Sequence, residues 1–166
     1  MNPTTAQARA LVSALAKHGV AQVVASPGSR NAPLTMALAS QEAIELHLRF
    51  DEQTAGFTAL GMAKATGRPV AVVVTSGTAV ANLAPAVYEA HEAGVPLIVI
   101  TADRPPAVRG KGANQTIEQF GLFSLAVRAE WDLPLAESRS EQYWELAIAN
   151  AVGEAMGDAF TAPGPV

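Results

Sequence analysis

Residues 69–101 read PVAVVVTSGTAVANLAPAVYEAHEAGVPLIVIT, and they are the most informative part of the sequence about the fold. A Val-rich run (69–75) is followed by a Ser-Gly-Thr turn, an Ala-rich helical segment (79–93) that stops at Gly94, and a second apolar run (95–101). Strands without a polar face are typical of parallel sheets that are covered on both sides, and a helix between two such strands forms a crossover connection. The stretch therefore predicts a parallel sheet with helices packed on it.

The alternation of strands and helices continues on both sides of this stretch. Helical spacing of apolar residues and capping signals predict further helices at residues 2–18, 32–40, 51–66 and 138–156. Short apolar or alternating runs predict further strands at residues 20–25, 44–50 and 125–133. We therefore expect one α/β domain over residues 1–166, a three-layer α/β/α structure with a central, mostly parallel sheet.

Several details of these elements can also be predicted. We expect Asn31 to cap the helix that follows it, and Ser138 with Glu141 to form a capping box. The alternating run 44–50 has one polar face, which is typical of an edge or interface strand. Residues 107–116 show no period and should form a long loop of the kind that often has a function, whereas the Pro- and Gly-containing tail 161–166 should be irregular.

The composition excludes several classes of protein. With 49% hydrophobic and 16% charged residues, the chain can bury a core, and a formal net charge of -4 argues against binding nucleic acid. The absence of cysteine excludes disulfides and thiolate metal sites. No secretory signal and no apolar run of about 20 residues is present, so we expect a soluble, cytoplasmic protein without membrane insertion.

Four polar side chains are expected at one rim of the sheet: Ser29, Glu52, Thr78 and Arg104. Each follows a predicted strand, and in open α/β sheets ligands bind beyond the carboxyl ends of the strands. Glu52 has two interpretations. It is either an acid that the helix macrodipole favours in a first turn, or a carboxyl group that shares a proton with a ligand nitrogen.

The loops around these residues leave alternatives open as well. The segment 26–30 and the turn 76–78 fit either plain turns or backbone N–H groups that face a ligand, although neither is a Walker loop. Arg104, Arg109 and Lys111 are either solvated surface charges or a cationic group for a carboxylate. The three histidines (18, 47 and 91) lack the spacing of metal ligands, and we assign them no function.

Five segments, taken together and in order, resemble the signatures of one enzyme family: residues 26–34 (SPGSRNAPL), 50–56 (FDEQTAG), 75–83 (TSGTAVANL), 101–106 (TADRPP) and 112–115 (GANQ). The family is that of the 2-succinyl-5-enolpyruvyl-6-hydroxy-3-cyclohexene-1-carboxylate synthases, thiamine-diphosphate enzymes of menaquinone biosynthesis. The resemblance covers roughly residues 20–123 and implies the pyrimidine-binding domain of such an enzyme. One departure is Gln53, where many members carry another polar residue.

The resemblance implies a reaction and a set of roles. The complete enzyme, a transferase, decarboxylates 2-oxoglutarate and adds the resulting succinyl carbanion to isochorismate. Glu52 would be the catalytic residue that hydrogen-bonds the aminopyrimidine ring of the cofactor. The remaining cofactor-binding residues would be Gly28, Ser76, Gly77, Thr78 and Asn82. The substrate-binding residues would be Ser29, Arg30, Arg104, Asn114 and Gln115.

The family's second half is expected to lie outside this chain. Its Gly-Asp-Gly motif holds Mg²⁺ and the diphosphate, and the only Gly-Asp here, at 157–158, is followed by Ala159, so we assign no metal ligand. We expect the central and diphosphate-binding domains to be absent, the chain alone to be inactive, and the complete enzyme to be a homodimer or homotetramer. The alternatives are a separate subunit of a split thiamine-diphosphate decarboxylase, such as sulfopyruvate decarboxylase, or a non-catalytic dimerisation module.

Overall fold

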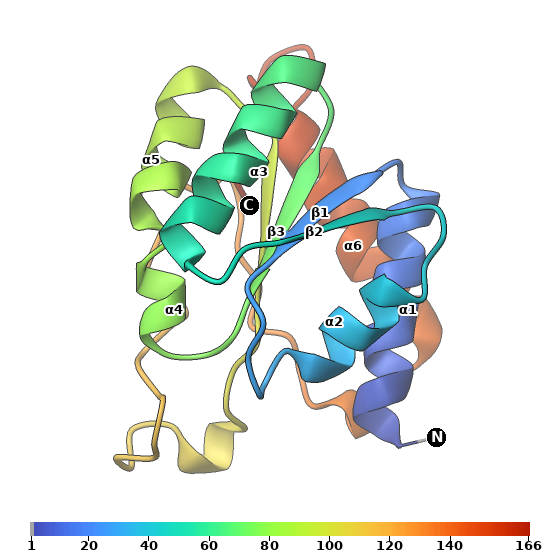
Figure 1. The fold of residues 1–166 in the computed structure, drawn as a ribbon, viewed down its shortest axis with the longest axis vertical. Helices are drawn as coiled ribbons and strands as arrows, with labels where there is room; N and C mark the ends of the chain where they lie inside the picture. The colour runs from blue at the N-terminus through green and yellow to red at the C-terminus, as the bar shows by residue number, and fades with distance from the viewer. Residues whose placement is uncertain (1) are drawn as a thin grey trace.

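A four-stranded parallel sheet lies at the centre of the computed structural model, which describes residues 2–166 (Figure 1). Its order is β2-β1-β3-β4, and its strands are β1 (Gln22–Ala25), β2 (Glu45–Leu48), β3 (Val70–Val74) and β4 (Leu97–Thr101). The register pairs Val24 with Val72 and Val72 with Val99. β3 is central and fully buried, as its continuous apolar sequence predicts.

Helices cover both faces of the sheet (Figure 1). One face carries α1 (Pro3–Lys17), α2 (Ala32–Ala39) and α6 (Glu141–Met156), and the other carries α3 (Glu52–Thr66), α4 (Thr78–Ala81) and α5 (Ala84–Ala93). Two short 3₁₀ turns, η1 (Pro106–Val108) and η2 (Ala136–Ser138), lie between β4 and α6. The predicted three-layer α/β/α class is confirmed.

Side chains of one strand supply two separate cores. Ala71 and Val73 of β3 pack on the side of α1 and α6, whereas Val70, Val72 and Val74 pack on the side of α3 and α5. Successive residues of a strand point to opposite faces, so a strand buried on both faces needs an apolar residue at every position. None of the helices in residues 2–166 has both the length and the apolar character needed to cross a membrane.

The predicted helix 79–93 is wrong, because the chain forms two helices there. α4 ends at Ala81, and α5 starts at Ala84 after Asn82 and Leu83. Pro85 has no N–H to donate to the carbonyl of Ala81, and its ring would clash with that carbonyl in a continuous helix. Proline is accepted in the first turn of α5, where no such bond is required.

Two of the predicted caps are also wrong. The Asn31 side chain does not cap α2; it is buried, and its Nδ2 donates to the carbonyl of Ser26 at 2.8 Å. Ser138 lies in η2, where its hydroxyl donates to the carbonyl of Leu135, and Ser140 occupies the N-cap position of α6. The short 3₁₀ turn therefore displaces the helix start by two residues.

The predicted strand 125–133 does not form, because the free edge of β4 is taken by the end of the chain. Val99 N donates to the carbonyl of Val166 at 2.7 Å, and Val166 N donates to the carbonyl of Leu97 at 2.9 Å. The tail expected to be irregular thus ends with ladder pairing. Residues 123–127 instead make turns, and Leu125 is 85% exposed.

β2 is an edge strand, as predicted, but its apolar face is incompletely covered. Leu48 is 50% exposed, and Phe50, just after the strand, is 89% exposed. Glu45 and His47 alternate with Leu46 and Leu48 along the strand. The strand therefore presents apolar side chains on the surface.

Candidate functional site

The candidate site lies where the chain reverses its direction across the sheet. The connection after β1 leads to β2 on one side, whereas the connection after β3 leads to β4 on the other. Ligands of open α/β sheets bind in the crevice at such a switch point, beyond the carboxyl ends of the strands. The loops after β1, β3 and β4 gather at the lower edge in Figure 1. The site is therefore bounded by residues 26–31 and 75–78.

These two loops approach each other closely at Gly28. A Cβ atom on Gly28 would lie 2.5 Å from the Cβ of Thr75, which is closer than real contacts allow. Glycine is required here because of this approach. The predicted cofactor residue Gly28 therefore lies directly beside the turn that contains Ser76, Gly77 and Thr78.

Buried polar side chains also collect at this edge of the sheet. Within residues 2–166, the buried polar residues are Ser26, Asn31, Thr75, Ser76 and Gln119. A buried polar group is informative because its desolvation must be offset by hydrogen bonds. The two cores, by contrast, are apolar, so polarity is concentrated at the switch point.

Glu52 lies in the first turn of α3, where Asp51 fixes the start of the helix. The Asp51 carboxylate accepts from Thr54 N at 2.7 Å, which leaves the Glu52 carboxylate free of a capping role. Asn82 follows α4, and its Nδ2 donates to Glu52 Oε2 at 3.2 Å. The side chain of Glu52 is partly exposed, so these residues alone do not enclose it in an apolar crevice.

The loop over 112–119 packs on the turn after β3. Ser76 Oγ donates to the carbonyl of Gln115 at 2.9 Å, and a Cβ on Gly77 would lie 3.1 Å from the Gln115 backbone. Gln115 itself has a φ of 58°, which is strained for a residue with a side chain. The predicted cofactor turn and the predicted substrate loop are thus in direct contact.

One nitrogen of Arg104 lacks a partner among the described residues, whereas all three nitrogens of Arg109 make hydrogen bonds. Arg104 Nη2 donates to the carbonyl of Asn114 at 2.6 Å, and its Nε is buried without a partner among the described residues. Arg109 Nε lies 2.9 Å from Asp103 Oδ2, and its Nη1 and Nη2 bind both oxygens of Asp132 at 2.6 and 3.0 Å. The hydrogen bond to Asp132 raises the pKa of Arg109, and burial raises the pKa of Asp103.

The predicted group of three cations is therefore smaller than expected. Arg109 is neutralised by Asp103 and Asp132 and holds the loop after β4 to the segment near residue 132. Its Nε also donates to the carbonyl of Arg104 at 2.9 Å. Of the two arginines, Arg104 is the one available to an anionic ligand.

A cavity of about 550 Å³ connects part of the predicted substrate set. Arg30, Arg104 and Gln119 line it together with residues of α1, β4 and α6. Glu52 and Ser29 do not line it. The structure therefore places these predicted residues in two groups, Glu52 with Asn82 and Arg30 with Arg104. Ser29 is exposed on the loop between β1 and α2.

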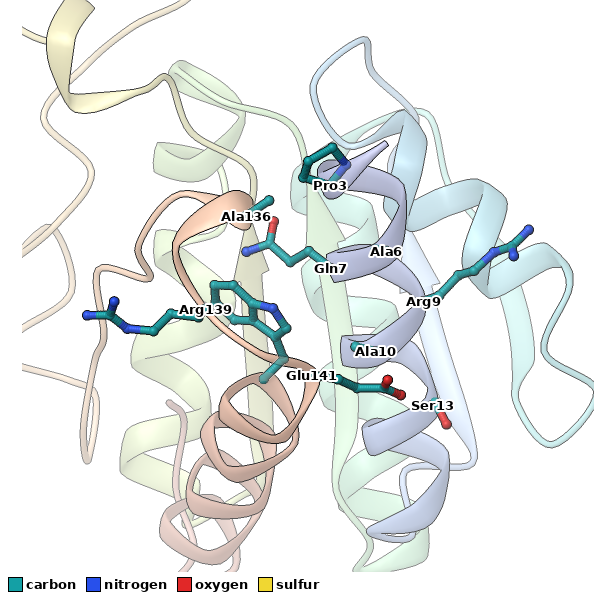
Figure 2. Close-up of a pocket in the computed structure, with 10 residues that line it drawn as sticks. Pro3, Ala6, Gln7, Arg9, Ala10, Ser13, Ala136, Arg139 and Glu141 are labelled. Carbon is teal, nitrogen blue, oxygen red and sulfur yellow. The ribbon is translucent and has the colours of Figure 1, made fainter. Parts of the chain in front are cut away.

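A second cavity, of about 360 Å³, lies between α1 and the start of α6 (Figure 2). Figure 2 shows Arg9 and Arg139 pointing away from each other, so these two cations do not converge on a ligand there. Within residues 2–166, no group of three or more His, Asp or Glu side chains could hold a metal ion. We therefore base the functional assignment on the switch point.

Comparison with known proteins identifies the domain at this point. The family described as "Thiamine pyrophosphate enzyme, N-terminal TPP binding domain" matches residues 5–122. The chain belongs to this family. The matched range contains β1 to β4 and every predicted site residue.

Individual relatives resemble this TPP binding domain over nearly its whole length. The 2-succinyl-5-enolpyruvyl-6-hydroxy-3-cyclohexene-1-carboxylate synthase of Saccharopolyspora erythraea is 54% identical over 98% of the chain. The proteins of the same name from Rhodococcus erythropolis and Thermobifida fusca are 53% and 51% identical over 100% of it. The chain spans about a third of these relatives, between 30% and 32% of their length.

The family predicted from the five sequence segments is confirmed, but one residue of the TPP binding domain was not predicted. Gln119 is buried and bonds to two of the loops described above. It lies in an irregular segment four residues after the last quoted motif, and no periodic pattern marks it as buried. Its neighbour in sequence, Glu118, is exposed.

Proposed function

We propose that this chain is the pyrimidine-binding half-site of a thiamine-diphosphate-dependent synthase of menaquinone biosynthesis. The complete enzyme would decarboxylate 2-oxoglutarate and join the remaining four-carbon unit to isochorismate. The observation that carries the proposal is the placement of Glu52, bonded to Asn82, beside the switch point of a TPP binding domain. The names of the relatives, which are synthases of a succinyl-substituted cyclohexene carboxylate, support the substrates.

The groups around Glu52 fit the pyrimidine end of thiamine diphosphate. An aminopyrimidine offers ring nitrogens that can share a proton with a carboxyl group, and Glu52 Oε1 has no partner among the described residues. Asn82 orients the other oxygen. When it is bound, thiamine diphosphate supplies an electron sink for decarboxylation of a 2-oxo acid.

The residues of this chain would form two sets, one that binds the cofactor and one that binds isochorismate. Glu52 would hold and share the proton of the pyrimidine ring, Asn82 would orient it, and Gly28 with the turn 76–78 would shape the pocket. Ser29, Arg30, Arg104, Asn114 and Gln115 would receive the carboxylates of isochorismate, for which the planar guanidinium group is suited. The cavity that Arg30 and Arg104 share is within the size range of small-molecule sites.

The remaining parts of the site would come from elsewhere in the complete enzyme. Mg²⁺ needs oxygen ligands and the diphosphate needs an anchor, and we assign both to a diphosphate-binding domain. Exposed apolar side chains at Leu48 and Phe50 support burial against another domain or subunit, and we propose a cytoplasmic homodimer or homotetramer.

Substitution of Glu52 tests this function directly. In the complete enzyme, Glu52→Gln should slow exchange of the cofactor's C2 proton by about 100-fold or more, because an amide cannot exchange a proton as a carboxyl group does. Exchange in deuterated buffer can be followed by proton NMR after rapid quenching. Glu89→Gln, at an exposed position of α5, is the matched control and should exchange at the wild-type rate. Unchanged exchange in Glu52→Gln would remove Glu52 from its proposed role.

A further inference from the structure

Gln119 is a buried side chain whose amide uses both of its ends. It is 9% exposed. Its Oε1 accepts from Gly77 N at 2.9 Å, and its Nε2 donates to the carbonyl of Ala102 at 3.1 Å. A weaker contact of 3.5 Å joins Nε2 to Thr101 Oγ1. The side chain therefore connects two segments of backbone, the turn after β3 and the end of β4, to its own loop.

The orientation of this amide is fixed by its partners. The amide of Gly77 can only donate and the carbonyl of Ala102 can only accept, so a rotated amide would place donor against donor and acceptor against acceptor. Gly77 has a φ of 84°, and its buried N–H donates to Gln119 among the described residues. A residue without both a donor and an acceptor would leave one of these backbone groups unsatisfied.

The two backbone groups belong to the two halves of the proposed site. Gly77 lies in the turn that leads through α4 to Asn82, the partner of Glu52. Ala102 lies two residues before Arg104, at the end of the neighbouring strand β4. One side chain therefore spans from the cofactor side to the acceptor side.

We propose that Gln119 is a positioning residue that sets the acceptor loop relative to the pyrimidine turn, a role that rests on the proposed function above. Its side chain bonds to the backbone of the 76–78 turn and to the backbone next to Arg104, so it fixes the position of one relative to the other. A purely structural role would change only the stability of the fold. A positioning role changes the Michaelis constant for the acceptor more than turnover of the donor.

The substitution Gln119→Glu makes the role measurable through pH. A protonated carboxyl group has one donor and one acceptor and can replace the amide, whereas the ionised form has no donor for the carbonyl of Ala102. In the complete enzyme, the ratio of the variant's KM for isochorismate to that of the wild type should rise about ten- to hundredfold from low to high pH. The charged residues on the joined segments, Asp103, Arg104 and Glu118, are common to both enzymes, so this ratio isolates position 119.

Two further variants complete the experiment. Gln119→Met removes both hydrogen bonds and should raise the KM for isochorismate at every pH, with a smaller effect on decarboxylation of 2-oxoglutarate alone. Gln142→Glu, an exposed glutamine in the first turn of α6, is the matched control and should behave as the wild type. A KM for isochorismate within about twofold of the wild type in both Gln119 variants, at all pH values, would overturn the proposal.

A measurement on the wild-type enzyme tests the proposal even if the Gln119 variants do not fold. Binding of isochorismate should slow hydrogen exchange in the peptide over residues 75–83, because Gln119 ties that turn to the acceptor loop, and unchanged exchange overturns the proposal. Failure of the proposed function has a different signature. A wild-type enzyme that does not join 2-oxoglutarate to isochorismate would refute that function, and the role of Gln119 with it, before any variant is compared.

Discussion

At the scale of single residues, two arginines five positions apart have opposite uses. The guanidinium of Arg109 is occupied by Asp103, Asp132 and the carbonyl of Arg104. Arg104 binds a single carbonyl oxygen, that of Asn114, and lines the large cavity. A sequence cannot separate these two residues, because the aspartate that makes the bidentate contact with Arg109 lies 23 residues away.

Loss of Arg104, the arginine without an acidic partner, should affect the use of isochorismate. In the complete enzyme, Arg104→Ala should lower kcat/KM for isochorismate by about 10- to 150-fold, which corresponds to the loss of a charge-assisted hydrogen bond worth about 1.5 to 3 kcal/mol. Decarboxylation of 2-oxoglutarate, measured without the acceptor, should change much less. Arg68→Ala, at an exposed position before β3, serves as the control. Equal losses in both half-reactions would contradict the assignment of Arg104 to the acceptor.

Much of the candidate site could be predicted from the sequence, since its residues follow predicted strands. Glu52 and Arg104 come just after β2 and β4, and parallel strands bring their carboxyl ends to one edge. The contacts between loops could not be predicted. The approach of Gly28 to Thr75 and the bonds of Gln119 depend on the distance between strands, which no local pattern encodes.

At the scale of elements, the strands that are buried on both faces were predicted correctly. The predictions failed where the position of a segment depends on which other segment pairs with it. β1, β3 and β4 are apolar on both faces, so their positions follow from composition. The strand expected at 125–133 does not form, and the backbone of Val166 pairs with the edge of β4 instead. The break between α4 and α5 was present in the sequence as Pro85, but the periodic apolar residues around it suggested a continuous helix.

The start of α3 should respond to pH through Asp51. Hydrogen bonds from the Thr54 side chain and backbone lower the pKa of Asp51 below its ordinary value of 3.8. Because the folded-state pKa is lowered, the cap stabilises the fold above pH 3.8, and this contribution is lost as the pH falls through the lowered pKa.

Two substitutions separate the cap from its charge. Asp51→Ala removes the acceptor and should lower the thermal unfolding midpoint at neutral pH by roughly 2–4 °C. Asp51→Asn keeps an acceptor without a titrating group, so the difference in midpoint between wild type and Asp51→Asn should shift in favour of the variant as the pH falls below 3.8. A difference that stays constant with pH would show that the Asp51 charge does not stabilise α3.

At the scale of the whole molecule, the isolated 166-residue chain should bind thiamine diphosphate only weakly. Glu52 can bind only the pyrimidine end of the cofactor, and one hydrogen bond contributes about 0.5 to 1.5 kcal/mol, whereas micromolar binding requires about 8 kcal/mol. Residues 2–166 contain no cluster of metal ligands to anchor the diphosphate. Calorimetric titration with thiamine diphosphate and magnesium measures this, with the complete enzyme as the positive control. Low-micromolar binding by the isolated chain would refute the expectation.

The pairing of Val166 with β4 also determines where the sheet is open to other molecules. An unpaired strand edge is a template on which a foreign strand can add and start aggregation. Val166 covers the β4 edge at Leu97 and Val99, so among residues 2–166 the open edge is β2. That edge is only four residues long and carries the charged side chain of Glu45 beside its apolar side chains, and both shortness and charge make an edge a poorer template. The fold thus limits intermolecular strand addition to one short segment beside Phe50.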